Sequence, residues 1–76
     1  MNTFDSVKAL VVETLGCEEN DVTLETNLKD DLGADSLTAV EMIMVLEDEF
    51  DIMIPEEASR DIETVGDLVN LVQSLL

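Results

Sequence analysis

Three segments of the chain place apolar residues at the spacing of an α-helix, and no useful length of sequence shows the alternation of a β-strand. Residues 4–15 form the first segment, which Gly16 would end, and residues 36–50 form the strongest one. Pro55 is expected to open a short helix, and Thr64 begins the capping pattern of a last long helix. The sequence therefore predicts an all-α fold, a small bundle of three long helices plus one short helix.

A long loop is expected between the first and second helices, across residues 16–35. It has no sustained periodicity, and loops of this length inside a compact domain are uncommon and usually functional. Isolated apolar side chains are expected to pin it to the core: Val22, Leu24, Leu28 and Leu32.

The length of 76 residues allows a single domain, 1–76, with no separate catalytic domain. Apolar residues make up 46% of the chain, too many for a disordered acidic tail, so we expect it to fold. Phe4 and Phe50 are the only aromatic residues, which leaves Leu, Val, Ile and Met to build an adaptable core. Cys17 has no partner for an internal disulfide and is expected to be small and partly buried. No secretory signal is visible, which indicates a cytoplasmic or organelle-internal protein.

The chain carries 19 acidic residues against three cations, a net charge of −16. This charge repels nucleic acid and anionic membranes, so the expected partners have basic surfaces. No apolar run approaches the ~20 residues of a membrane span, so we expect neither a nucleic-acid partner nor stable membrane insertion. A monomer is expected, and salt or divalent cations should stabilise it against its self-repulsion.

Two apolar sides compete on the helix expected at residues 36–50. A helix in a small bundle buries one side, and the larger and more continuous side should be the core. That side is expected to comprise Ala39, Met42, Ile43, Leu46 and Phe50.

The opposite side carries a stripe of Leu37, Val40 and Met44, bordered by Glu41 and Asp48. An exposed apolar stripe with a charged border is typical of a transient docking surface. The alternative is that Val40 or Met44 packs under the long loop.

Ser36 stands at the start of this helix, after Gly33, Ala34 and Asp35, where its hydroxyl should face solvent. Asp35 or Ser36 can cap the helix, and a plain capping serine is the simplest interpretation of the residue type. A phosphate on the hydroxyl would instead lie beside backbone N–H groups at the positive end of the helix dipole. The residues alone leave both interpretations open.

The residue inventory argues against catalysis by this chain. It contains no histidine, so a serine–histidine relay is excluded, and neither Lys8 nor Lys29 is expected to act as a base among so many acids. One cysteine without histidine leaves only carboxylate ligands for a hard cation, and the residues after Asp30 do not fit a calcium-binding loop. We therefore expect no catalytic residue and no metal site.

The chain resembles the acyl carrier proteins in four places: DLGADSL at residues 31–37, EDEFD at 47–51, IP at 54–55 and TVGD at 64–67. The similarity covers nearly the whole chain. It implies a discrete carrier of dissociated (type II) fatty acid synthesis, with 4'-phosphopantetheine on Ser36. A phosphopantetheinyl transferase would attach this arm from coenzyme A, and its thiol would hold growing fatty acyl chains as thioesters.

The resemblance also implies partners, which are acyltransferases, ketosynthases, reductases and dehydratases with basic docking patches. The bundle interior would shelter the acyl chain. Together with the apolar stripe, the resemblance predicts these partner contacts: Asp35, Leu37, Val40, Glu41, Met44, Glu47 and Asp48.

Three positions depart from the family pattern and leave the subtype open. Thr38 stands where an acid is frequent, Leu28 where an aromatic residue is common, and Leu71 where a tyrosine is frequent. The alternatives are a carrier for polyketide or specialised lipid assembly, an unmodified acidic interaction protein, and a cation buffer.

Overall fold

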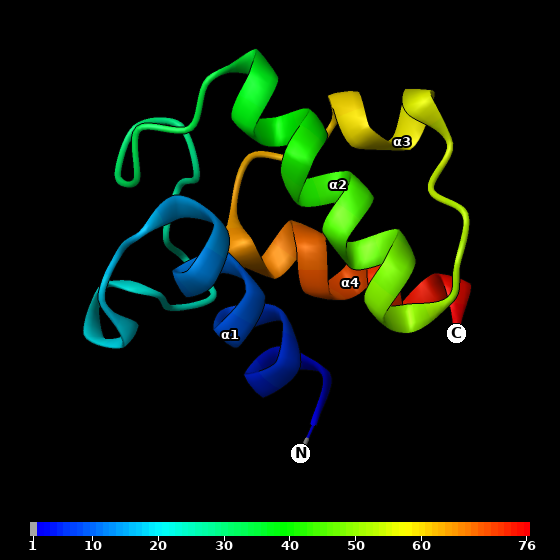
Figure 1. The fold of residues 1–76 in the computed structure, drawn as a ribbon, viewed down its shortest axis with the longest axis horizontal. Coiled ribbons are helices and arrows are strands. Elements are labelled where there is room, and N and C mark those ends of the chain that lie inside the picture. Colours follow the sequence, from blue (N-terminus) through cyan, green and yellow to red (C-terminus); the bar gives the residue numbers. More distant parts are fainter. Residues whose placement is uncertain (1) are drawn as a thin grey trace.

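The computed structural model describes residues 2–76 and confirms the predicted bundle of three long helices and one short helix. The helices are α1 (Thr3–Leu15), α2 (Ser36–Phe50), α3 (Glu56–Arg60) and α4 (Val65–Leu75). A 3-10 turn that the sequence did not predict, η1 (Glu19–Asp21), interrupts the long loop. Figure 1 shows α1 beside α2, and α4 crossing behind α2, with the short α3 at one edge of the molecule.

The long helices begin and end at local signals. Asn2 caps α1, since its Oδ1 accepts a hydrogen bond from the Asp5 N–H at 2.8 Å. Gly16 ends α1 in the left-handed conformation, with φ 69°. At α4, Thr64 Oγ1 accepts from the Asp67 N–H and the Asp67 carboxylate accepts from the Thr64 N–H, which confirms the predicted capping pattern.

The core lies where α1, α2 and α4 meet. On the side of α2 predicted to be core, Met42 and Leu46 are buried and Ile43 and Phe50 are half-buried. The prediction was wrong for Ala39, which is exposed because its part of α2 borders a pocket instead of the core. The buried apolar side chains are Val7, Val11, Val22, Met42, Leu46, Ile54, Val65, Leu68, Val69 and Val72.

The backbone anchors the long loop as much as its side chains do. Val22 is buried, and Leu28 and Leu32 are half-buried, as predicted. Leu24 was predicted to pin the loop through its side chain, but that side chain is 49% exposed. Its carbonyl is the anchor instead, because it accepts a hydrogen bond from the Gly66 N–H at 2.9 Å.

Gly66 makes this close approach of the loop to α4 possible. A Cβ at its position would lie 2.9 Å from the carbonyl oxygen of Leu24, closer than real Cβ atoms come to other atoms. A second backbone bond joins the Leu28 N–H to the Glu63 carbonyl at 2.9 Å. The start of α4 therefore fixes the loop that leads into α2.

Cys17 follows α1 and lies half-buried, as predicted. Its Sγ is 3.9 Å from the carbonyl oxygen of Val11. This arrangement is that of a small packing residue at the end of a helix.

Candidate functional site

Ser36 is the first residue of α2, and the loop before it is tightly hydrogen-bonded. Gly33 adopts φ 72°, a left-handed conformation that suits glycine, and its N–H donates to the Lys29 carbonyl at 3.1 Å. The Ala34 N–H donates to the Leu28 carbonyl at 2.9 Å. These bonds turn the chain so that Ser36 emerges exposed at the helix N-terminus.

Asp35, and not Ser36, caps α2. Its Oδ1 accepts hydrogen bonds from the N–H and the hydroxyl of Thr38, each at 2.8 Å. The bond from the Thr38 N–H, followed by the hydroxyl bond, lowers the pKa of the Asp35 carboxyl below its ordinary value. Within residues 2–76 the Ser36 hydroxyl makes no hydrogen bond, so it has no capping role. A phosphate on Ser36 would share this helix end with the Asp35 carboxylate.

A pocket of about 820 Å³ opens beside Ser36. This volume lies within the roughly 300–1,000 Å³ usual for ligand pockets. Ser36 and Asp35 line the pocket and are exposed, which places them at its rim. The sequence suggested a sheltered interior only through the family resemblance, because the lining comes from segments far apart in the chain. Its apolar part consists mainly of Leu15, Leu28, Met42, Ile43, Ile54, Ile62 and Leu68.

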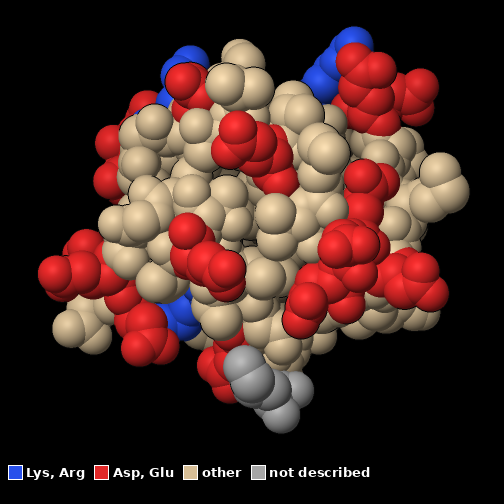
Figure 2. Space-filling model, viewed as in Figure 1, with Lys and Arg blue, Asp and Glu red and all other residues tan. Residues whose placement is uncertain are grey.

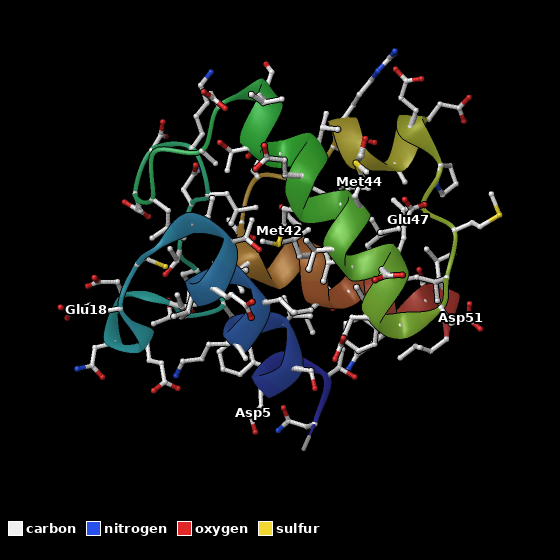
Figure 3. The ribbon with its side chains drawn as sticks, in the orientation of Figure 1. Asp5, Glu18, Met42, Met44, Glu47 and Asp51 are labelled. Atoms are coloured by element: carbon white, nitrogen blue, oxygen red, sulfur yellow. The ribbon has the colours of Figure 1, made fainter. Side chains whose placement is uncertain are left out.

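The predicted stripe on α2 is exposed, at 68% for Leu37, 56% for Val40 and 61% for Met44. This excludes the alternative that Val40 or Met44 packs under the long loop. Both residues also line the pocket, and Figure 3 shows Met44 on the side of α2 that faces α3. The bordering acids Glu41 and Asp48 are exposed as well. The stripe and the pocket are therefore continuous.

Glu47 differs from the other acids predicted to contact partners. It is half-buried, and its Oε2 accepts a hydrogen bond from the Ile54 N–H at 2.8 Å. Figure 3 shows Glu47 between α2 and the segment that leads from α2 to α3. The sequence predicted only an exposed partner contact, because no local pattern indicates a bond that reaches seven residues along the chain.

Figure 2 shows acidic side chains spread over one face of the molecule, between areas of uncharged residues. Arg60 pairs with Glu56 at 3.1 Å, but both side chains are exposed, so the pair contributes little to stability. The Lys8 amino group lies 5.9 Å from the ring centre of Phe4. Across residues 2–76 no group of side chains is arranged to hold a metal ion, and no helix is long and apolar enough to cross a membrane.

The family model for the phosphopantetheine attachment site matches residues 5–72. A candidate acyl carrier protein from Mycobacterium tuberculosis is 36% identical and has a TM-score of 0.89, with 95% of this chain and 96% of that chain covered. This chain belongs to the acyl carrier protein family. A second family member, the acyl carrier protein from Enterococcus faecalis, whose high thermal stability has been linked to novel structural components, is 35% identical. Its TM-score is 0.82, with 100% of each chain covered.

Membership in the family confirms two predictions made from the sequence. Acyl carrier proteins are carriers and not enzymes, which agrees with a chain that has no histidine. The matching model is that of a phosphopantetheine attachment site, which confirms covalent 4'-phosphopantetheine as the cofactor. An acyl carrier protein interacts with biosynthetic enzymes.

Proposed function

We propose that Ser36 carries the 4'-phosphopantetheine arm and that the loaded protein delivers growing fatty acyl chains between enzymes of dissociated fatty acid biosynthesis. The main support is the exposed hydroxyl of Ser36, which makes no hydrogen bond within residues 2–76 and lies at the rim of the pocket. The position suits a long arm, because one end can be fixed at the rim while the other reaches solvent or the pocket.

Attachment would join Ser36 Oγ to the phosphorus of the arm and break the bond from that phosphorus to the adenosine bisphosphate half of coenzyme A. The hydroxyl proton needs a base, and the chain has no histidine to take it. Asp35 is a poor candidate, because its pKa is lowered and its Oδ1 already accepts two hydrogen bonds from Thr38. The base therefore belongs to the transferase. Once attached, the arm supplies the thiol that holds the acyl chain as a thioester.

The pocket suits the acyl chain of a fatty acid. Its deeper lining is aliphatic, and burial of an alkyl chain there gains roughly 25 cal/mol for each Å² of apolar surface removed from water. A chain that enters beside Ser36 would pass between α2 and the segment that carries α3.

The exposed stripe of α2 and the acids around it form a docking surface that suits partners with basic patches. The proposed partners are phosphopantetheinyl transferase, acyltransferases, ketosynthases, reductases and dehydratases, and the protein would meet them as a cytoplasmic monomer. Charges around an exposed apolar stripe steer association and give specificity at modest affinity. The surface comprises Asp35, Leu37, Val40, Glu41, Met44, Glu47 and Asp48.

The attachment site can be tested by intact mass measurement after incubation with coenzyme A and a phosphopantetheinyl transferase. We expect the wild-type protein to gain one phosphopantetheinyl group and Ser36→Ala to gain none. Ser74→Ala, which removes an exposed hydroxyl from α4, is the matched control and should be modified normally. An adduct that survives Ser36→Ala would overturn the attachment proposal.

The pathway needs a separate test, because polyketide carriers use the same arm. The loaded protein should be offered to a fatty acid ketosynthase and, in parallel, to a polyketide ketosynthase. We expect elongation by the first at the higher kcat/KM. A clear preference for the polyketide enzyme would indicate that the protein serves polyketide synthesis instead.

A further inference from the structure

One wall of the pocket is a strap that joins α2 to α4, which we define as residues 51–64. Ile54, Ser59 and Ile62 of this strap line the pocket. Its helix, α3, has five residues and no side-chain cap, and its ion pair between Arg60 and Glu56 lies within the helix. A helix this short has little stability of its own, so the position of the strap depends on its ends.

The end of the strap next to α4 is fixed by the long loop. The Leu28 N–H donates to the Glu63 carbonyl at 2.9 Å, and Asn27 forms an antiparallel bridge with Thr64. The Asp67 carboxylate also accepts a hydrogen bond from the Glu63 N–H at 3.0 Å. This end therefore moves only with the start of α4.

Glu47 makes two hydrogen bonds to the end next to α2, which the buried side chain of Ile54 also anchors. The Glu47 carbonyl accepts from the Ile52 N–H at 3.2 Å, and its carboxylate accepts from the Ile54 N–H at 2.8 Å. Hydrogen bonds to an ionised acceptor are about twice as strong as neutral ones. Ile54 is 8% exposed and, like Glu47, lines the pocket, so the bond joins α2 to the opposite wall.

We infer that Glu47 is a positioning residue, whose carboxylate holds Ile54 and thereby keeps the strap closed against the pocket. This role needs a hydrogen-bond acceptor at position 47, whereas the docking role proposed for the same residue needs its charge. The two roles respond differently to substitution, because glutamine keeps an acceptor oxygen and removes the charge. The inference rests on the proposed function only for the identity of what the pocket holds.

The first test compares Glu47→Ala with Glu47→Gln in the unloaded protein. Amide hydrogen exchange at Ile54, measured by NMR, should be about tenfold faster in Glu47→Ala, because the loss of this bond frees the N–H. In Glu47→Gln it should stay within about threefold of the wild-type rate, since the amide oxygen still accepts. Asp48→Ala removes a neighbouring exposed acid and should leave the exchange unchanged. Equal exchange in all four proteins would overturn the inference.

The second test measures how well the pocket protects its contents. Each protein would carry an octanoyl thioester on the arm, and hydroxylamine would cleave it in the absence of any partner enzyme. We expect cleavage several-fold faster in Glu47→Ala, with Glu47→Gln and Asp48→Ala close to wild type. If Glu47→Gln and Glu47→Ala behave alike, the acceptor has no positioning role and the inference fails. Failure to load the wild-type protein would instead overturn the proposed function, and the exchange test on unloaded protein would still decide the role of Glu47.

Discussion

Replacement of Gly66 by alanine tests whether the contact between α4 and the long loop outweighs helix propensity in the free energy of unfolding. Alanine is the better helix former by up to about 1 kcal/mol, so helix propensity alone predicts a more stable protein. The contact with Leu24 predicts the opposite. A Cβ would lie 2.9 Å from the Leu24 carbonyl oxygen, where ordinary contacts begin at 3.4 Å.

The size of the effect follows from this distance. The carbonyl must retreat by about 0.5 Å, which stretches its 2.9 Å hydrogen bond from the Gly66 N–H beyond the usual range of about 2.7–3.2 Å. This partly exposed hydrogen bond contributes about 0.5–1.5 kcal/mol, and the forced shift of the backbone costs about 1–3 kcal/mol more. Because the propensity gain is smaller, we expect Gly66→Ala to lower the free energy of unfolding by about 1 kcal/mol. For a domain of this size that corresponds to a fall in Tm of about 4–8 °C.

Urea denaturation of Gly66→Ala and of a matched control measures the effect. Asn70→Ala introduces the same residue at an exposed position of α4, where no contact opposes it, and should raise stability by about 0.5 kcal/mol. The two variants should therefore shift the denaturation midpoint in opposite directions at an unchanged m-value. If Gly66→Ala were as stable as the wild type or more so, the close approach of the loop would not constrain this position.

Four further predictions concern stability and docking. Leu46→Ala, at a fully buried position, should cost about 2–5 kcal/mol in urea denaturation, and a cost below 1 kcal/mol would contradict the packing. The N–H groups of Thr64 and then Glu63 lower the pKa of Asp67. Its carboxylate therefore stabilises the fold above its unfolded pKa, and this contribution disappears as pH falls through the folded pKa. The stability advantage of the wild type over Asp67→Asn at pH 7 should vanish in acid, and an advantage that persisted there would refute the assignment. Sodium or magnesium chloride should raise Tm by screening the charge of −16, and a Tm insensitive to both would count against strong self-repulsion. Glu41→Lys should lower the kcat/KM of a partner enzyme with a basic surface, and the difference from the wild type should shrink as salt is added. An unchanged kcat/KM would show that Glu41 lies outside the docking surface.

The limits of the helices were predictable because they depend on interactions within a few residues. Gly16 ends α1 through a backbone conformation that glycine adopts easily, and Thr64 with Asp67 starts α4 through reciprocal hydrogen bonds. For α2 the sequence left Asp35 and Ser36 as candidate caps. The structure assigns the cap to Asp35, which leaves the Ser36 hydroxyl unbonded within residues 2–76.

The exposed stripe on α2 was predictable for a similar reason. A helix in a bundle this small can bury one side, so the periodicity alone separated the buried Leu46 from the exposed Leu37 and Met44. The same reasoning failed for Ala39, because periodicity says which side of a helix faces inward but not where the neighbouring elements stop.

The sequence by itself determined the helices, the acidic surface and the position of Ser36 at the start of α2, since all three follow from local order along the chain. The tertiary structure alone decided the pocket, the anchoring of the loop through the Leu24 carbonyl and the bond between Glu47 and Ile54. These features join segments far apart in the chain or depend on the path of a turn. Local patterns specify which residues prefer to be buried, but the space between packed elements exists only once those elements meet.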